Sequence, residues 1–152
     1  MGSNKVLVSK KLAESASSRA VEKSVLVSGT QTAYWFYPST SVDAPEIILI
    51  HGYRGNHRGL EAIAGALEDF NVYIPDLPGF GKSQAFDHNH SIKNYSNWLV
   101  GFIAALGLHE KPILLGHSFG SIICAAFAAS SEQIRMLVLE NPVSAPALDG
   151  EK

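Results

Sequence analysis

Four short, uninterrupted apolar runs punctuate the sequence. Such runs are typical of strands that are buried on both faces of a parallel sheet. They span residues 47–50, 72–74, 113–115 and 136–139.

The segments between these runs predict helices. Apolar residues recur at helical spacing over residues 60–67 and 92–106, and Ser91 and Gly107 suit the start and the end of the second helix. Residues 121–129 are apolar nearly all round, as expected for a helix packed between other elements. Strands that alternate with helices predict an α/β fold, with a mostly parallel sheet covered by helices on both faces.

Two more strands are predicted before the first of these runs, at residues 24–28 and 32–37, joined by a turn at Gly29-Thr30. The second is rich in aromatic residues, which fit a half-buried pleated surface. The sheet should therefore have about six strands, with an antiparallel hairpin at its N-terminal end. Residues 1–22, rich in Ser, Ala and Lys, are predicted to form a weakly ordered arm or a short helix, and residues 23–142 to form the folded core.

Composition narrows the class of protein. The chain has 152 residues, 46% hydrophobic and 17% charged, which fits one folded domain. The net charge is −2 and the basic residues are scattered, so no nucleic-acid partner is expected. No apolar run reaches the roughly 18 residues of a membrane span, and Lys10 and Lys11 interrupt the N-terminal region. We therefore expect a cytoplasmic protein with no membrane partner, and the single cysteine, Cys124, as a small buried hydrophobe.

The chemistry of the chain centres on the pentapeptide Gly116-His117-Ser118-Phe119-Gly120. It follows a predicted strand and precedes a predicted helix. A Gly-x-Ser-x-Gly turn between strand and helix exposes its serine hydroxyl at the edge of the sheet. The alternative interpretation is a serine that only caps the following helix.

Two other loops follow predicted parallel strands. One is His51-Gly52-Tyr53-Arg54-Gly55, and the other runs from Asp76 to Ser83. Ligands bind at the carboxyl ends of strands in open α/β sheets, so both loops should lie near the serine turn. Gly81-Lys82-Ser83 is similar to the end of a phosphate-binding loop, but that motif needs glycine at position 76, where this chain has aspartate.

The remaining histidines give no metal site. His88 and His90 lie in a predicted surface loop without a cluster of acidic or cysteine ligands, and His57 and His109 are also expected at the surface. No metal and no cofactor are predicted.

Together, the three loops resemble those of the α/β-hydrolase superfamily, over residues 24–142. The resemblance implies a serine hydrolase that acts on an ester, amide or other acyl-type bond of a small molecule through Ser118. It also implies that the backbone N–H groups of Tyr53 and Phe119 form the oxyanion hole. The site would be shaped by residues flanking these positions: His51, Gly52, Gly116, His117 and Gly120.

The chain departs from the family pattern after the serine. Family members place an acid and then a histidine after the nucleophile, but all six histidines of this chain precede Ser118. Glu140, at the end of the last apolar run, is the candidate acid. Residues 143–152 would be the start of a missing lid or a frayed tail. We therefore expect a truncated α/β-hydrolase fold that lacks the base.

A non-enzymatic alternative stays open. The chain would then be a catalytically silent half-domain that binds a small ligand or a partner chain. The last strand, within residues 134–139, would leave an exposed sheet edge at which two copies could associate.

Overall fold

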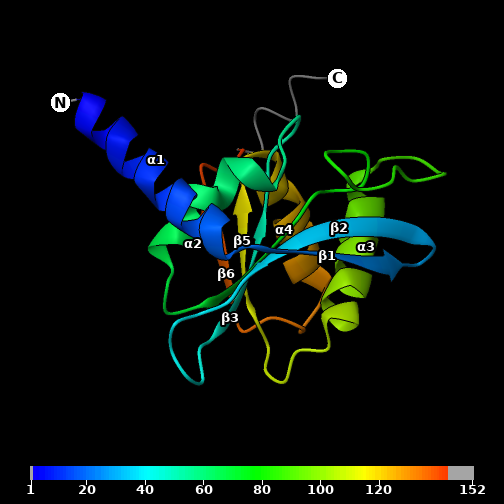
Figure 1. Ribbon diagram of the computed structural model, residues 1–152. Coiled ribbons are helices and arrows are strands. Elements are labelled where there is room, and N and C mark those ends of the chain that lie inside the picture. The colour runs from blue at the N-terminus through cyan, green and yellow to red at the C-terminus, as the bar shows by residue number, and fades with distance from the viewer. Residues whose placement is uncertain (1, 144–152) are drawn as a thin grey trace.

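A computed structural model describes residues 2–143 (Figure 1). Its elements follow one another in the order α1 (Gly2–Arg19), β1 (Val21–Val27), β2 (Thr30–Tyr37), β3 (Glu46–Ile50), a short 3-10 helix η1 (His57–Leu60), α2 (Glu61–Ala66), β4 (Asn71–Pro75), α3 (Ile92–Leu106), β5 (Ile113–His117), α4 (Phe119–Ser130) and β6 (Met136–Glu140).

The six strands form one sheet in the order β1-β2-β4-β3-β5-β6. Strands β1 and β2 pair antiparallel, as does β2 with β4, whereas β4, β3, β5 and β6 run parallel to one another. The predicted fold class is therefore confirmed: a mostly parallel sheet with an N-terminal antiparallel hairpin.

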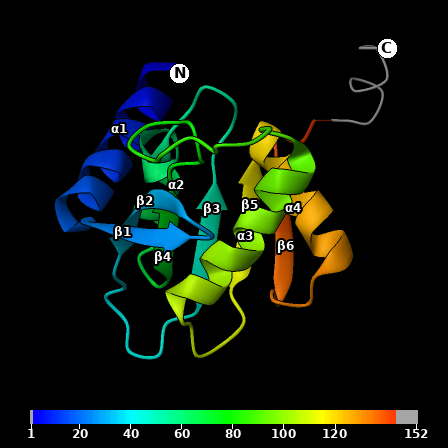
Figure 2. The ribbon, with the colours of Figure 1, turned by 90° about the vertical axis from the view of Figure 1, so that its right-hand side faces the viewer.

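Helices cover both faces of this sheet (Figure 2). Alternate residues of β3 point to opposite faces: Ile48 and Ile50 join the core beneath α3 and α4, and Ile47 and Leu49 join the core beneath α1 and α2. Burial on both faces explains why the inner parallel strands β3 and β5 read as unbroken apolar runs. Cys124 of α4 is fully buried, as predicted.

The ends of α3 match their sequence signals. The Ser91 hydroxyl accepts a hydrogen bond from the Asn94 N–H at 3.1 Å, and Gly107 adopts the left-handed conformation with φ of +61°. These are the N-cap and C-cap that the sequence predicts.

Residues 1–22 contain more regular structure than a short helix. Helix α1 has 18 residues, and strand β1 begins at Val21 rather than at residue 24. The second half of α1 packs on α2, where Ala16 is fully buried and the Arg19 guanidinium donates to the Ala64 carbonyl oxygen at 2.6 Å. The backbones of the two helices meet at Gly65, since any Cβ at that position would overlap the carbonyl group of Leu12.

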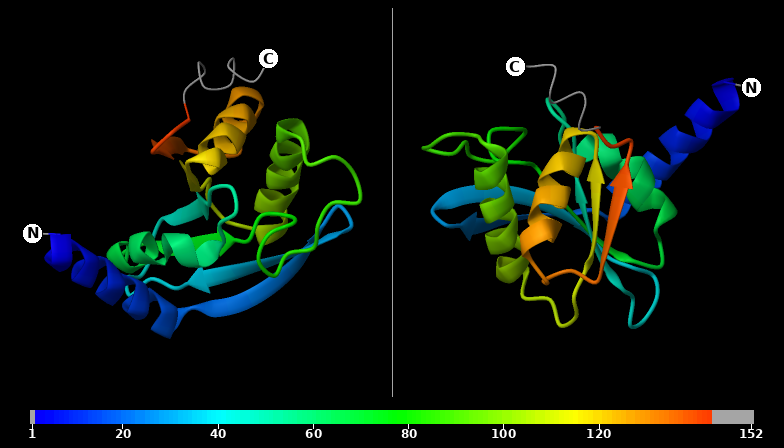
Figure 3. Two further views of the ribbon diagram at one scale, coloured as in Figure 1. Left: turned by 90° about the horizontal axis from the view of Figure 1, so that it is seen from above. Right: turned by 180° about the vertical axis from the view of Figure 1, so that it is seen from behind.

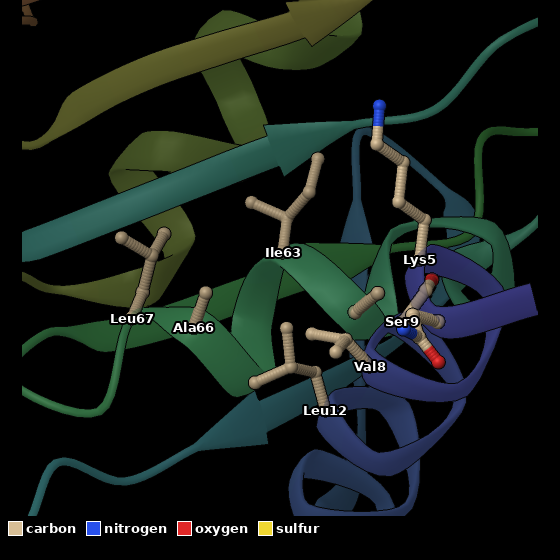
Figure 4. A pocket seen from close by; sticks show the side chains of 9 residues that line it. Lys5, Val8, Ser9, Leu12, Ile63, Ala66 and Leu67 are labelled. Carbon is tan, nitrogen blue, oxygen red and sulfur yellow. The ribbon is translucent and has the colours of Figure 1, made fainter. Parts of the chain in front are cut away.

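Toward its N-terminus, α1 projects beyond the sheet (Figure 1). Here α1 and α2 enclose an apolar groove of about 560 Å³ whose walls include Val8, Leu12, Ile63 and Leu67 (Figure 4). All of its lining residues belong to these two helices and the residue that follows α2, and none belongs to the loops expected at the site.

At the other end of the sheet, β6 pairs with one strand among residues 2–143, β5 (Figure 3). Its residues Met136 and Leu139 are exposed.

No helix in residues 2–143 is both long enough and apolar enough to span a bilayer.

Candidate active site

Ser118 is the single residue between β5 and α4. Its φ of +52° and ψ of −120° lie in a region that a residue with a side chain rarely adopts. Its N–H donates to the Glu140 carbonyl oxygen at 3.1 Å, and its own carbonyl oxygen accepts from the Ser121 N–H at 2.8 Å. These two hydrogen bonds hold the turn in its strained form.

The Ser118 side chain does not cap the helix that it precedes. Within residues 2–143 the hydroxyl has no hydrogen-bond partner, and the residue is half-buried. The capping interpretation of this serine is therefore wrong. The hydroxyl stands at the N-terminus of α4, where the helix dipole favours negative charge.

The two outer glycines of the pentapeptide permit close backbone contacts. A Cβ at Gly116 would lie 2.6 Å from the Gly120 carbonyl oxygen and 2.8 Å from the Cys124 sulfur. A Cβ at Gly120 would lie 2.6 Å from the His51 carbonyl oxygen. Any larger residue at either position would push β5, α4 and the loop after β3 apart.

The loop after β3 passes directly beside Ser118. A Cβ built at Gly52 would lie 3.2 Å from the Ser118 Cβ. A turn closed by the Gly55 N–H and the Gly52 carbonyl oxygen, 3.0 Å apart, follows. Tyr53 and Phe119 thus flank the serine from two elements, and within residues 2–143 the N–H of neither has an acceptor.

His51 joins two of the predicted loops. Its Nδ1 lies 2.7 Å from the Gly52 carbonyl oxygen, and its Nε2 accepts a hydrogen bond from the Leu77 N–H at 2.9 Å. A carbonyl oxygen can only accept, so the proton resides on Nδ1. Burial lowers the pKa of this imidazole, which keeps it neutral. With both nitrogens engaged, His51 ties the loops together and cannot take a proton from Ser118.

The loop after β4 is built around Asp76, which is fully buried. One carboxylate oxygen accepts from the His57 N–H at 2.7 Å and lies 2.9 Å from the His57 Nδ1. The other accepts from the Lys82 N–H at 3.0 Å. Burial would raise the pKa of Asp76, but these hydrogen bonds outweigh it, and the pKa lies below the ordinary value. The loop's donors therefore serve its own aspartate, not a bound phosphate.

The prediction that His57 lies at the surface is wrong. Its ring is buried and stacks on Trp35, with centroids 3.3 Å apart and planes within 9°. A buried carboxylate at a strand end needs hydrogen-bond donors close to it, and His57 can supply them. The position of Asp76 after a buried strand was therefore the sequence signal for a buried histidine partner, and the hydrophobic pattern alone does not contain it.

Glu140 lies at the same edge of the sheet as Ser118, on the strand next to β5. It is in register with His117, and the Glu140 carboxylate pairs with the His117 Nδ1. The candidate acid thus contacts the histidine of the pentapeptide. Both side chains are partly exposed.

A pocket of about 310 Å³ opens beside the serine turn. Its lining comes from the three predicted loops, from the segment between Ser83 and α3, and from the start of α3: Tyr53, Gly79, Phe80, Ala85, His90, Tyr95 and Phe119. The sequence predicted that the three loops lie near the serine, but it did not place Ala85, His90 or Tyr95 at the site. No group of three potential metal ligands occurs in the part of the chain that the structure describes, and His88, His90 and His109 are exposed.

Comparison with known proteins agrees with this geometry. The family model described as alpha/beta hydrolase fold matches residues 45–152. The chain belongs to the α/β-hydrolase family.

Two bacterial lipases are among its relatives. Lipase 3 of Moraxella sp. (strain TA144) is 32% identical over 116 residues, which are 76% of this chain and 36% of the lipase. Lipase 1 of Psychrobacter immobilis is 31% identical over 110 residues, which are 72% of this chain and 34% of that protein.

Among solved structures, a bacterial membrane phospholipase A described as a virulence factor superimposes with a TM-score of 0.76 at 28% identity, covering 93% of this chain and 44% of its own. The chain spans about a third of the length of the lipases that it matches.

Proposed function

We propose that this chain is the N-terminal part of a serine hydrolase that cleaves a carboxylic ester, with Ser118 as the nucleophile. The observation that carries the proposal is the strained backbone of Ser118, with a hydroxyl that caps nothing. A strained residue persists only where the surrounding structure holds it in place, and such residues cluster at active sites, where the strained geometry serves the mechanism. The relatives named lipases make an ester the favoured bond, ahead of an amide.

In the proposed reaction, the Ser118 Oγ forms a bond with the substrate's carbonyl carbon. The carbonyl π electrons move to its oxygen, and the hydroxyl proton passes to a base. The N–H groups of Tyr53 and Phe119 then donate to the developing oxyanion. Loss of one such donor typically costs about 2.7–4 kcal/mol of transition-state stabilisation. Collapse of the intermediate expels the alcohol, and water hydrolyses the acyl-enzyme.

The base is proposed to come from the rest of a longer protein. Among residues 2–143, no histidine forms a hydrogen bond with the Ser118 hydroxyl. His51 and His57 are held by the loops, and His117 pairs with Glu140. A histidine and an orienting acid encoded after Lys152 would complete the site from the open side of Ser118.

A silent half-domain is the second candidate, and the edge strand β6 favours it. In the described part of the chain this strand pairs only with β5 and exposes Met136 and Leu139, so another chain could extend the sheet there. Size-exclusion chromatography of the 152-residue chain with light scattering tests it. If the wild-type chain is a dimer and Leu139→Lys is a monomer, pairing at the sheet edge is supported. If the wild-type chain is a monomer at all concentrations, self-association is excluded.

The proposed function is tested on the product of the extended reading frame. A fluorophosphonate probe should label it on Ser118, and Ser118→Ala should abolish both labelling and hydrolysis of a short acyl ester. Ser130→Ala, an exposed serine at the far end of the same helix, is the matched control and should change neither. A folded extended protein that is not labelled at Ser118 would exclude the nucleophile.

A further inference from the structure

The pocket beside the serine turn is small, and four of its seven lining residues are Phe or Tyr. The side chains of Tyr53 and Phe119, the residues proposed to donate to the oxyanion, form two of its walls, and Phe80 and Tyr95 form two more. A group attached to a carbonyl held between these two N–H groups would therefore lie next to this pocket. At about 310 Å³ it lies at the low end of ligand pockets, although an apolar cavity of about 150 Å³ already holds benzene.

The walls present both faces and edges of aromatic rings. Tyr53 meets Phe80 and Phe119 at centroid distances of 5.8 and 5.9 Å, with interplanar angles of 76° and 71°. Tyr95 meets Phe119 at 6.0 Å and 86°. Aromatic pairs prefer this edge-to-face geometry. A flat ring bound among these four side chains could make edge-to-face contacts with several of them.

Hydrogen bonds and packing keep most of these walls in place. The Tyr95 hydroxyl donates to the Pro78 carbonyl oxygen at 2.7 Å, so its oxygen accepts from the His90 Nδ1, 2.9 Å away. The proton of His90 therefore resides on Nδ1, and within residues 2–143 neither its Nε2 nor the Tyr53 hydroxyl has a hydrogen-bond partner. Phe80 is held edge-to-face against His51 at 5.8 Å.

We propose that this pocket binds an aryl group, and that the substrates are compact aryl-bearing esters rather than long-chain lipids. The inference rests on the proposed function, because it takes the pocket as the subsite next to Ser118. A preformed aromatic pocket of this size favours one flat ring over a flexible chain. The ring makes several edge-to-face contacts and loses little conformational freedom on binding.

Binding can be measured without turnover on the 152-residue chain. Benzylphosphonate, cyclohexylmethylphosphonate and n-heptylphosphonate share a head group and a carbon count, and differ only in the shape of the apolar part. NMR titration should give the benzyl compound a Kd about tenfold lower than that of the n-heptyl compound, since each aromatic contact contributes about a two- to tenfold factor. Equal or tighter binding of the n-heptyl compound, which is flexible, or of the cyclohexylmethyl compound, which is a ring without aromatic character, overturns the proposal.

Variants separate the pocket from the serine. Ala85→Trp, at an exposed position of the rim, should weaken benzylphosphonate about tenfold or more, and Ala105→Trp, at an exposed site on α3 outside the lining, should not. Benzyl binding that survives Ala85→Trp places the ring elsewhere and overturns the proposal. Because the titration involves no reaction at Ser118, failed fluorophosphonate labelling removes the proposed function, whereas lost ring selectivity removes only the aryl subsite.

Discussion

The backbone of Glu140 forms a hydrogen bond with Ser118, and the Glu140 side chain pairs with His117, the residue before Ser118. The Glu140 carbonyl oxygen accepts the Ser118 N–H at 3.1 Å, and the Glu140 carboxylate pairs with His117 across β5 and β6. Edge strand β6 thereby fixes the turn from the neighbouring position in the sheet. Only the carbonyl contact is independent of the residue type at position 140, so the two contributions can be separated by mutation.

Glu140→Gln should cost little stability. The carboxylate contact with His117 is lost, but both side chains are about one-third to one-half exposed, and the bond to Ser118 uses the backbone. Exposed pairs are worth up to about 1 kcal/mol, so urea unfolding should shift by no more than that. A loss of several kcal/mol would show that the carboxylate supports the turn in a way that the geometry does not indicate.

Asp76→Ala should be far more damaging. It removes the acceptor of three donors, from His57 and Lys82, in a fully buried place. Breaking a buried charged network typically costs about 3–5 kcal/mol, measured by urea unfolding at neutral pH. Asp87→Ala is the matched control, because Asp87 also pairs with a histidine, His88, but in an exposed loop. Equal effects of the two substitutions would contradict this view of the loop.

The same aspartate predicts a pH dependence. The pKa of Asp76 is lower in the folded chain than its ordinary value because the hydrogen bonds from His57 and Lys82 outweigh the opposing effect of burial. Its stabilisation is therefore complete above the unfolded value of about 3.9 and is lost as the pH falls through the lower folded pKa. When the free energy of unfolding is measured at decreasing pH, it should fall less steeply in Asp76→Asn than in the wild type. An equal slope in the two proteins would contradict a lowered pKa of Asp76 in the folded chain.

Sequence patterns predicted the elements far better than the contacts between them. Unbroken apolar runs located the parallel strands, and burial on both faces accounts for the runs of the inner strands β3 and β5 but not for that of the exposed edge strand β6. The Gly-x-Ser-x-Gly spacing located the turn, because Gly116 and Gly120 are needed where backbones touch. The burial of His57 against Trp35 and Asp76 could not be predicted in this way. That contact joins three elements, and no local period encodes it.

The N-terminal segment shows the same limit. The sequence predicted only a weakly ordered arm or a short helix before residue 23, yet α1 runs for 18 residues. Its order comes from packing on α2, where Gly65 admits the backbone of Leu12. A helix stabilised mainly by one tertiary contact leaves little trace in its own sequence.

Gly120→Ala should destabilise the protein although it lies in a helix. Replacing a helical glycine by alanine normally stabilises by about 0.5–1 kcal/mol, but here the new methyl group would overlap the carbonyl oxygens of Ile50 and His51. Overpacking of this kind typically costs about 1–3 kcal/mol, so the sign should be reversed in thermal or urea unfolding. Gly59→Ala, where a Cβ meets nothing within 4 Å, is the control and should be neutral or slightly stabilising. Stabilisation by Gly120→Ala would show that the loop after β3 can move away.

Ser118→Gly should make the chain more stable while removing its proposed nucleophile. The backbone conformation of Ser118, with φ of +52° and ψ of −120°, is strained for any residue with a Cβ but not for glycine. Strain of this kind is worth about 1–3 kcal/mol, partly offset by the greater freedom of glycine in the unfolded chain. A net gain of about 1 kcal/mol in urea unfolding is therefore expected. Ser118→Ala removes the same hydroxyl but keeps the Cβ, so it should not reproduce this gain. If both variants gained equally, the stabilisation would come from loss of the hydroxyl, and the turn would not store strain.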